Sequence, residues 1–267
     1  MGKIFGKKNK KLGLGLGGGG AKGSVHLGVL RAFEEEGIKF DVVVGTSIGS
    51  LIGALYARGL SAKEIETIIS NSTLSDVKHL LFTRFTGGGV DQMIKLATGN
   101  LEFDDLKLPF ASVAVDLYSG KEVVFTEGNL IKCIGASCAI PPYFHAVEYN
   151  DAKYVDGAFR NIIPCDAAKN LGADFVVGVD LSMNRQSNEI SRRALNEMYP
   201  ENGIVPCNPS ENGYAACDVM IAPDLTGYRS TSITSMSEMF DIGYFAAKEK
   251  MPEVKAALER NKVRKFD

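Results

Sequence analysis

The sequence is poor in histidine and lacks long apolar runs, paired cysteines and any strong excess of charge. It has only three histidines, and no apolar run approaches the roughly 18 residues needed to cross a bilayer. The five cysteines are odd in number and include no CxxC pair, so we expect free thiols in a reducing cytoplasm. No residues have the spacing of a metal site, so we expect neither a metal nor an organic cofactor. A net charge of −2 and a pI near 6.0 give no electrostatic attraction to nucleic acid.

The beginning of the chain also lacks the marks of a targeting segment. Residues 1–11 contain five lysines and no apolar core of a secretory signal. Position 6 is Gly, where the myristoylation pattern requires Ser or Thr. We therefore expect residues 1–10 to form a solvated basic tail, with weak attraction to an anionic membrane as the alternative.

Composition and patterning favour one globular α/β domain over residues 11–267. The apolar fraction of 45% and the charged fraction of 23% are ordinary for a soluble protein. Short apolar runs alternate with amphipathic stretches, which is typical of an α/β fold with a largely parallel sheet. Internal repeats are absent, and no linker indicates a second domain. The oligomeric state is not predicted.

The pattern predicts the following elements. Strands are expected at Leu12–Leu16, Phe40–Val44, Ala111–Leu117, Glu122–Phe125, Lys153–Val155, Asp174–Asp180 and Asp218–Ala222. Helices are expected at Lys22–Glu36, Ser50–Arg58, Asn129–Ala139, Cys165–Leu171 and Glu189–Met198, after a capping box of Ser61 and Glu64, and at the end of the chain.

Two segments are less regular. Residues 71–108 are expected to hold short helices, and the apolar run Leu80–Phe85 favours core packing over a membrane-docking rim. Residues 183–216 are polar and rich in Asn, Ser and Pro. We interpret them as an excursion from the core that could cover a site.

The segment GTSIG at residues 45–49 fits G-x-S-x-G, the nucleophile elbow. This chemistry needs a serine on a strained strand-to-helix turn, and flanking glycines allow such a tight backbone. The pattern alone is weak. It gains support because FDVVV before it is typical of a strand and SLIGALYAR after it of a helix. Ser47 is therefore the candidate nucleophile.

A nucleophilic serine needs a base, and the histidines are poorly placed for that role. In α/β-hydrolases the triad residues follow the order Ser, acid, His. His26 precedes Ser47 and is expected to be a satisfied core or surface histidine. His79 lies in the irregular segment, and His145 has no strand-end context. A histidine triad is disfavoured, which leaves a carboxylate as the direct base.

Asp156 is the candidate carboxylate. It lies in YVDGAFRN at the end of a predicted strand, and Gly157 would let its side chain approach a neighbouring site closely. Burial and a hydrogen bond to Ser47 could raise its pKa and orient it. By itself, however, Asp-Gly is more often a plain turn. The local sequence leaves this choice open.

The glycine-rich segment GGGGAKG at residues 17–23 is the third motif. Such a strand-to-helix turn presents backbone N–H groups beside a positive helix end, which suits a phosphate or an oxyanion. Gly18, Gly20 and Gly23 also fit the dinucleotide fingerprint, but Asp41 starts the second strand, whereas the ribose-binding acid ends it. The Walker A order is absent because the sequence runs Lys-Gly-Ser. Both nucleotide interpretations are therefore weaker.

Taken in order, these motifs resemble the patatin-like phospholipase family. G-G-G-x-K-G is followed by G-x-S-x-G about twenty-five residues later and by D-G-A about a hundred residues after that. The segment ASCAIPPYFHAV is similar to the family's stretch before its aspartate, and the similarity spans roughly residues 11 to 180. The resemblance implies a three-layer α/β/α fold with a mainly parallel central sheet. It also implies a Ser–Asp dyad acting on lipid carboxylic esters, with Ser47 as nucleophile and Asp156 as base.

The resemblance extends to the surroundings of the dyad. It implies an oxyanion hole formed by the backbone of Gly18, Gly19 and Gly20, with Lys22 nearby. The glycines that support the motifs are Gly23, Gly45, Gly49 and Gly157. Gly17 stands where many members have Asp, and the last third of the chain matches no part of the family that would identify substrate-side residues.

These inferences predict a serine hydrolase that forms an acyl-enzyme from a lipid ester at a membrane or micelle surface. The expected location is the cytoplasm, with peripheral membrane contact as an option. The main alternative is a non-catalytic phosphate or nucleotide binder that uses the glycine-rich loop. A degenerate family member that binds lipid without hydrolysis is a third, and the intact Ser47 and Asp156 argue against it.

Overall fold

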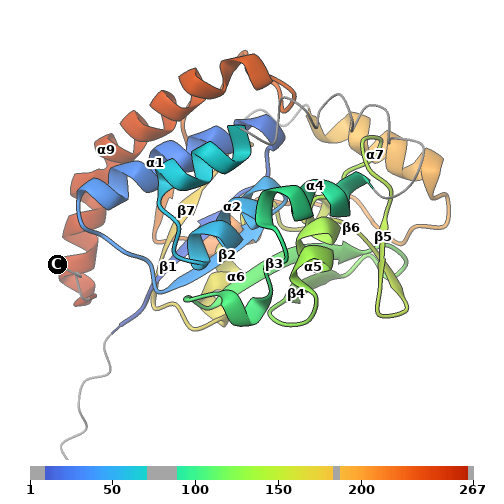
Figure 1. The fold of residues 1–267 in the computed structure, drawn as a ribbon, viewed down its shortest axis with the longest axis horizontal. Helices are drawn as coiled ribbons and strands as arrows, with labels where there is room; N and C mark the ends of the chain where they lie inside the picture. Colours follow the sequence, from blue (N-terminus) through green and yellow to red (C-terminus); the bar gives the residue numbers. More distant parts are fainter. Residues whose placement is uncertain (1–9, 71–88, 183–186, 264–267) are drawn as a thin grey trace, which may run out of the picture.

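The structure, a computed structural model, describes residues 10–70, 89–182 and 187–263. In this part of the chain eight strands form one sheet with helices on both faces (Figure 1). The strands are β1 (Leu12–Leu16), β2 (Val42–Thr46), β3 (Phe110–Asp116), β4 (Glu122–Phe125), β5 (Val147–Tyr149), β6 (Ala152–Asp156), β7 (Phe175–Val179) and β8 (Val219–Ile221).

The α-helices cover the two faces of this sheet. They are α1 (Ser24–Glu35), α2 (Ile48–Ala57), α4 (Gly89–Thr98), α5 (Leu130–Ser137), α6 (Cys165–Asn170), α7 (Ser187–Met198), α8 (Glu211–Ala216) and α9 (Met236–Asn261), with a further helical stretch at residues 62–70. Single 3-10 turns lie at Gly20–Gly23, Phe103–Asp105, Gly157–Phe159 and Ile233–Ser235.

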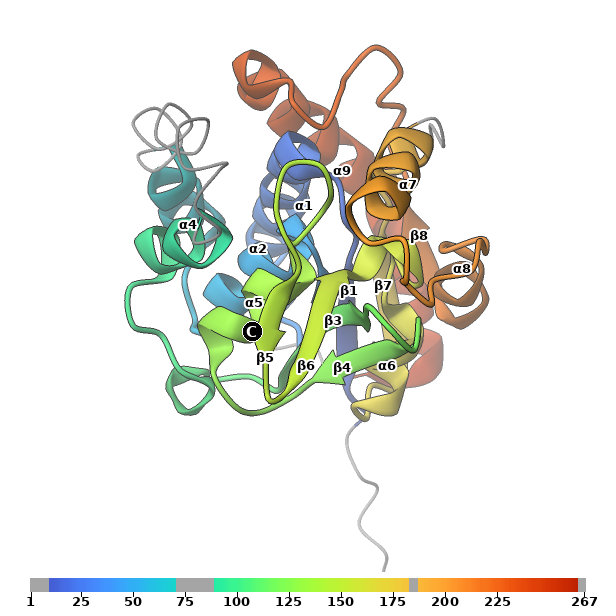
Figure 2. The same cartoon turned by 90° about the vertical axis from the view of Figure 1, so that its right-hand side faces the viewer.

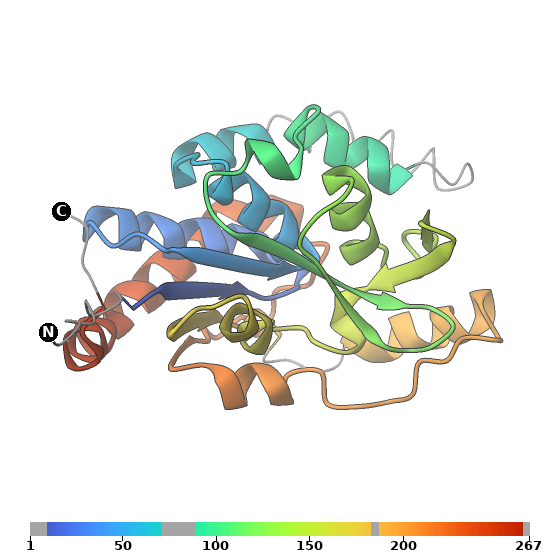
Figure 3. The ribbon, with the colours of Figure 1, turned by 90° about the horizontal axis from the view of Figure 1, so that it is seen from below.

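The sheet has the order β5-β6-β3-β2-β1-β7-β8, and β4 pairs with β3 outside this path. Strands β3, β2, β1, β7 and β8 are parallel, whereas β4, β5 and β6 join at one end as antiparallel strands. Figure 3 shows the sheet between helices coloured blue to green and the golden α6. The prediction of a three-layer α/β fold with a mainly parallel sheet is confirmed.

The alternating sequence LGLGL shows how β1 serves both faces. Leu12, Leu14 and Leu16 are buried in the cluster that also holds α1, α2 and α9. The glycines between them face α6, where a Cβ at Gly15 would lie 2.7 Å from the Cys165 Sγ. Large side chains therefore fill one face, and missing side chains let α6 pack closely on the other.

The predicted elements form, with small shifts at their ends. The second strand begins two residues later than expected because Asp41 is held in the loop, where its N–H donates to the Leu12 carbonyl at 2.7 Å. The capping box is present: the Glu64 carboxylate accepts the Ser61 N–H at 2.8 Å. The sequence missed β5, α8 and the length of α9. In the β5–β6 hairpin, Asn150 and Asp151 both have positive φ, which is the signal that local analysis overlooked.

Residues 187–216 pack against the molecule rather than standing away from it. Leu195 of α7 and Ile204 are buried with Val115 and Phe159 in a separate apolar cluster. The Ile162 N–H donates to the Pro209 carbonyl at 2.9 Å. The segment therefore has its own buried contacts in a cluster separate from the main core, and its interpretation as an excursion from that core stays a prediction. Its role as a cover stays a prediction.

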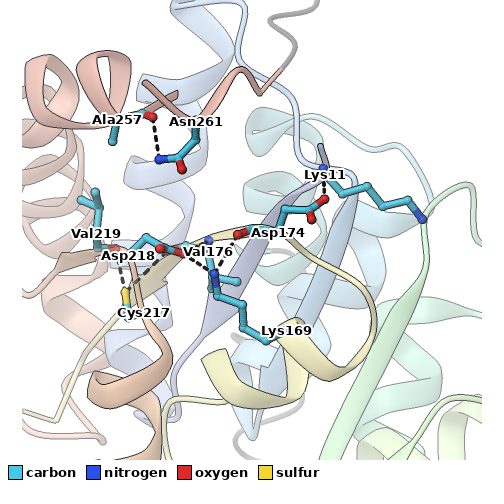
Figure 4. Close-up of polar contacts among 9 residues, drawn as sticks. All are labelled: Lys11, Lys169, Asp174, Val176, Cys217, Asp218, Val219, Ala257 and Asn261. Atoms are coloured by element: carbon cyan, nitrogen blue, oxygen red, sulfur yellow. Dashed lines mark hydrogen bonds and ion pairs between the residues drawn. The ribbon is translucent and has the colours of Figure 1, made fainter. Parts of the chain in front are cut away.

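The end of the sheet opposite the strand–helix turns is closed by polar contacts (Figure 4). The Asp218 carboxylate accepts the Val176 N–H at 2.7 Å and forms an ion pair with Lys169 at 2.5 Å. Asp174 accepts the Lys11 N–H at 2.8 Å. These bonds fix the starts of β1, β7 and β8, and leave the opposite strand ends available for a site.

Within the described ranges, no helix has the length and apolarity required to cross a bilayer. Residues 1–9 of the predicted basic tail 1–10, the run Leu80–Phe85 and His79 lie outside the described residues.

Candidate active site

Ser47 occupies a sharp turn between β2 and α2. Its backbone has φ 56° and ψ −126°, a conformation that a non-glycine residue adopts only under strain. The turn needs glycine on both sides. A Cβ at Gly45 would lie 2.2 Å from the Gly49 carbonyl oxygen, and a Cβ at Gly49 would lie 2.2 Å from the Leu16 carbonyl oxygen. The predicted strand–turn–helix setting of Ser47 is confirmed.

The sheet brings Asp156 to this turn. Thr46, the last residue of β2, pairs with Val113 of β3, and Asp156, the last residue of β6, pairs with Ala114. Since β4 occupies the other edge of β3 at both positions, β2 and β6 share one edge and meet end to end. Strand β2 runs toward this junction and β6 runs toward it from the opposite direction. Residues that are more than a hundred positions apart therefore become neighbours.

At the junction the Ser47 hydroxyl donates to the Asp156 carboxylate at 2.7 Å. The second carboxylate oxygen accepts the Ala158 N–H at 2.8 Å, which fixes the orientation of the group. Asp156 is buried whereas Ser47 is partly exposed. Burial raises the pKa of Asp156 to about 7, and the hydrogen bonds from Ala158 and Ser47 lower it by less. A carboxylate with a pKa near neutrality beside a hydroxyl has the character of a general base.

The last residue of α5 and the residues that follow it contact both Ser47 and Asp156. The Ser47 N–H donates to the Ser137 hydroxyl at 2.8 Å, and the Asp156 N–H donates to the Ala139 carbonyl at 3.1 Å. The buried Cys138 thiol lies against Ser47, and burial raises its pKa well above the usual value. Sequence analysis did not single out these residues, although the small side chains of ASCA, in a segment that resembles the family, were the available signal.

The glycine-rich loop packs directly against Ser47. A Cβ at Gly18 would lie 3.4 Å from the Ser47 Cβ. The N–H of Gly18 donates to the Ile162 carbonyl at 2.9 Å, and that of Lys22 to the Gly19 carbonyl at 3.2 Å. The N–H groups of Gly19 and Gly20 have no acceptor among the described residues. The loop's available donors are thus at the two glycines that reach the surface.

Two other predicted glycines support the site through close packing. A Cβ at Gly23 would lie 2.4 Å from the side chain of Ile48, the first residue of α2. A Cβ at Gly157 would lie 2.4 Å from the Val113 carbonyl oxygen. Gly23 therefore lets the loop approach the start of α2, and Gly157 lets the end of β6 approach β3.

Lys22 is largely buried beside this loop. Burial lowers the pKa of its ammonium group, and the nearby Asp180 carboxylate partly offsets that effect. Asp180 is itself buried at the end of β7 and accepts a hydrogen bond from the Tyr214 hydroxyl at 2.8 Å. Lys22 thus places a cationic side chain near the glycine-rich turn.

Neither described histidine contacts Ser47 through a hydrogen bond. His26 is fully buried, and its Nε2 lies 2.8 Å from the Gly17 carbonyl oxygen. Burial lowers the pKa of His26 to about 4, so the ring is neutral and Nε2–H is the donor. His26 is confirmed as a core residue, but the expectation of full satisfaction is corrected: its Nδ1 has no partner among the described residues. His145 is exposed, with Nδ1 3.4 Å from the Tyr199 hydroxyl.

This role of His26 leads to a direct test. Replacing His26→Leu should lower stability by about 1–3 kcal/mol because the buried Gly17 carbonyl loses its donor. Ester turnover should stay within about tenfold of wild type, whereas loss of a triad histidine costs about 10⁴-fold or more. Thermal melts and kcat/KM measure both effects, and His26→Gln, which keeps a donor, is the control. A collapse of turnover in a folded His26→Leu protein would favour a catalytic histidine.

No group of three or more His, Cys, Asp or Glu side chains in the described residues could hold a metal ion. In Figure 2, the parallel strands β1, β7 and β8 lie beneath α7.

Comparison with known proteins reveals clear relatives. The sequence model of the patatin-like phospholipase family matches residues 14–169. "Patatin-like phospholipase domain-containing protein 6" of Mus musculus is 34% identical over 178 residues, which covers 62% of this chain and 13% of that protein. "Lysophospholipase NTE1" of Pyricularia oryzae is 32% identical over 181 residues, covering 64% of this chain and 12% of that protein. The chain thus spans only a small part of the length of these relatives.

A solved structure shares the fold. VipD from Legionella pneumophila aligns with a TM-score of 0.53 at 14% sequence identity, covering 92% of this chain and 67% of that one. At 92% coverage the match includes most of the last third of the chain, which the family's sequence model does not reach. At this identity the likeness concerns the architecture alone.

Proposed function

The chain belongs to the patatin-like phospholipase family, and we propose that it is a serine hydrolase that cleaves carboxylic ester bonds of lipids through Ser47 and Asp156. The observation that carries this proposal is the 2.7 Å hydrogen bond between the strained, partly exposed Ser47 hydroxyl and the buried Asp156 carboxylate. The names of the relatives, a phospholipase and a lysophospholipase, support a lipid ester as the substrate class.

The proposed reaction begins with proton transfer from Ser47 to Asp156. The serine oxygen attacks the ester carbonyl, and the tetrahedral oxyanion collapses to an acyl-enzyme as the leaving alcohol takes the proton from Asp156. Asp156 then removes a proton from water, which attacks the acyl group and releases the fatty acid while Ser47 regains its proton. A single carboxylate can serve both half-reactions because its pKa lies near 7.

We propose the N–H groups of Gly19 and Gly20 as the oxyanion donors. They are the donors of this loop that have no acceptor among the described residues. Gly18 packs against Ser47 but its N–H is engaged, and Lys22 would act through its charge rather than its N–H. Ser47 also immediately precedes the first residue of α2, so the positive end of this helix dipole would favour developing negative charge.

A phosphate or nucleotide binder is the alternative from another class. The same free N–H groups and Lys22 would suit a phosphate. That function, however, assigns no role to the hydrogen bond between Ser47 and Asp156 or to the strained turn. We therefore put the hydrolase first, with a lipid surface as its proposed partner.

To test this proposal, the full chain is incubated with a panel of phospholipid, lysophospholipid and neutral glyceride esters of several acyl lengths. Release of free fatty acid from at least one class is expected, and the preferred class identifies the substrate. Equilibrium dialysis with common nucleotides and inorganic phosphate runs beside it. Tight binding of either, with no hydrolysis of any ester, would support the alternative and reject the hydrolase.

The shifted pKa of Asp156 predicts the pH dependence. The carboxylate must be ionised to accept the serine proton, so kcat/KM should rise about tenfold per pH unit below pH 7 and level off above it. The measurement needs an uncharged ester and quantification of the acid by chromatography, so that neither substrate nor signal titrates. A rate that is constant from pH 5 to 8 would contradict Asp156 as the base.

A further inference from the structure

The ladder between β2 and β3 stops one rung before the nucleophile. The Val43 N–H donates to the Pro109 carbonyl at 3.0 Å. In a parallel ladder the N–H groups that face one neighbour recur at every second residue. Ser47 and Val113 lie four residues beyond Val43 and Pro109, so they are the pair that a continued ladder would join directly.

Ser137 occupies the position of this missing rung. Its hydroxyl accepts the Ser47 N–H at 2.8 Å and donates to the Val113 carbonyl at 2.5 Å. The side chain is fully buried, so water does not compete for either bond. A single hydroxyl thus bridges the N–H and the carbonyl that would otherwise bond to each other.

We propose that Ser137 is a positioning residue, an inference that rests on the proposed function. Its hydroxyl keeps the Ser47 backbone at a distance from β3 and thereby holds Ser47 Oγ against Asp156. The spacing keeps residue 47 at its positive φ, out of the line of the strand. Without the hydroxyl, the Ser47 N–H can reach the Val113 carbonyl only by moving toward β3. That movement would carry Oγ away from its 2.7 Å contact with the carboxylate.

The same segment also supports the second catalytic residue. Two positions after Ser137, the Ala139 carbonyl accepts the Asp156 N–H at 3.1 Å. The end of α5 therefore contacts the backbone of both members of the dyad. Ser137 acts on the nucleophile through a side chain, which makes its contribution accessible to substitution.

The chain contains a matched control for this arrangement. The buried Ser112 hydroxyl accepts a hydrogen bond from the Ser50 hydroxyl at 2.7 Å and donates to the Cys133 carbonyl at 3.0 Å. Like Ser137, it links α2, β3 and α5 and is fully buried. It touches neither Ser47 nor Asp156 through these bonds. Removing either hydroxyl should have a similar effect on stability.

The experiment compares Ser137→Ala with Ser112→Ala in the full chain. Both variants should lose a similar amount of thermal stability. Ser137→Ala should reduce kcat about 100-fold with KM within about threefold, because a small displacement of a reacting group has effects of this size. The rate of labelling of Ser47 by a fluorophosphonate should fall in parallel. Ser112→Ala should keep kcat within about threefold, and Ser137→Thr, which retains the hydroxyl, should recover most of the loss.

Equal activity in the two alanine variants would overturn the positioning role, as would a loss in Ser137→Ala confined to KM. If Ser137→Ala is recovered only unfolded, Ser137→Cys takes its place, since a thiol fills the site but is a weak hydrogen-bonding group. The kcat and KM of Ser137→Cys are then compared with those of Ser112→Ala, and equal activity would again overturn the positioning role. A wild-type chain that hydrolyses no ester would reject the proposed function together with this role, whereas an active wild type with an equally active Ser137→Ala rejects the role alone.

Discussion

Replacing Ser47→Ala should abolish ester hydrolysis and covalent labelling by a fluorophosphonate, with kcat/KM lower by at least about 10⁴-fold. The hydroxyl that the substitution removes is the one held 2.7 Å from the carboxylate, and the variant has no other atom there that can form an acyl-enzyme. The fold should persist because the bond from the residue 47 N–H to Ser137 does not involve the lost oxygen. Labelling, fatty-acid release and thermal melts measure the three effects.

The control for this substitution is Ser50→Ala, three residues further along the same turn and helix. Ser50 is buried, and its hydroxyl bonds to Ser112 instead of facing the dyad. It should keep labelling and turnover close to wild type at a small cost in stability. Labelling of Ser47→Ala at the wild-type rate would show that another residue is the nucleophile.

Replacing Asp156→Asn should reduce kcat about 10²–10⁴-fold while making the protein more stable at pH 8. The amide keeps the size of the side chain and can still accept the Ala158 N–H and contact Ser47. It cannot take a proton from the serine. Activity is therefore lost without loss of packing.

The stability gain follows from the direction of the pKa shift. Burial raises the pKa of Asp156 from 3.8 to about 7, so between these pH values the folded protein binds more protons than the unfolded chain. Wild-type stability therefore falls as pH rises through this window, and the full penalty applies above pH 7. At about 1.36 kcal/mol per pKa unit, an upper bound for the penalty is about 4 kcal/mol. The neutral amide has no such penalty.

Denaturant unfolding at pH 5 and pH 8 measures this difference. The stability advantage of Asp156→Asn over wild type should be larger at pH 8. The control is Asp218→Asn at the opposite end of the sheet, where the carboxylate is paired with Lys169 and accepts a backbone N–H. This change should lower stability and leave turnover intact. An advantage of equal size at both pH values would mean that the Asp156 carboxylate is not destabilised by burial.

The elements that could be predicted are those whose causes are local. The Leu-Gly alternation of β1, the capping box at Ser61 and the close contact between Gly45 and Gly49 involve residues only a few positions apart, and the structure has each of them where expected. The β5–β6 hairpin was missed although its turn is local, because Asn150 and Asp151 were not recognised as residues with positive φ. Boundaries moved by one or two residues where a distant partner, such as Leu12 for Asp41, holds the chain.

Ser47 and Asp156 differ in how far the sequence alone indicated their positions in the site. The sequence by itself indicated the turn at Ser47, because the clash that demands glycine at position 45 is with Gly49, within the motif, whereas Gly49 is required by the Leu16 carbonyl of the neighbouring strand β1. Asp-Gly at 156–157 is compatible with an ordinary turn, and the poorly placed histidines together with the family's motif order selected it. The sheet decided the pairing, since β2 and β6 meet on one edge of β3.

Tertiary structure alone also decided which loop donors are free and which hydroxyl supports the nucleophile. The Gly18 N–H is occupied by Ile162, and Ser137 bridges Ser47 and Val113, through contacts between residues 24 to 144 positions apart. No local pattern encodes such contacts, because a hydrogen bond depends on distance and direction in the folded chain and not on separation in the sequence. Ser47 could therefore be recognised as the candidate nucleophile from its neighbours in sequence, whereas its contact with Asp156, the unoccupied donors of the loop and its bond to Ser137 depend on its neighbours in space.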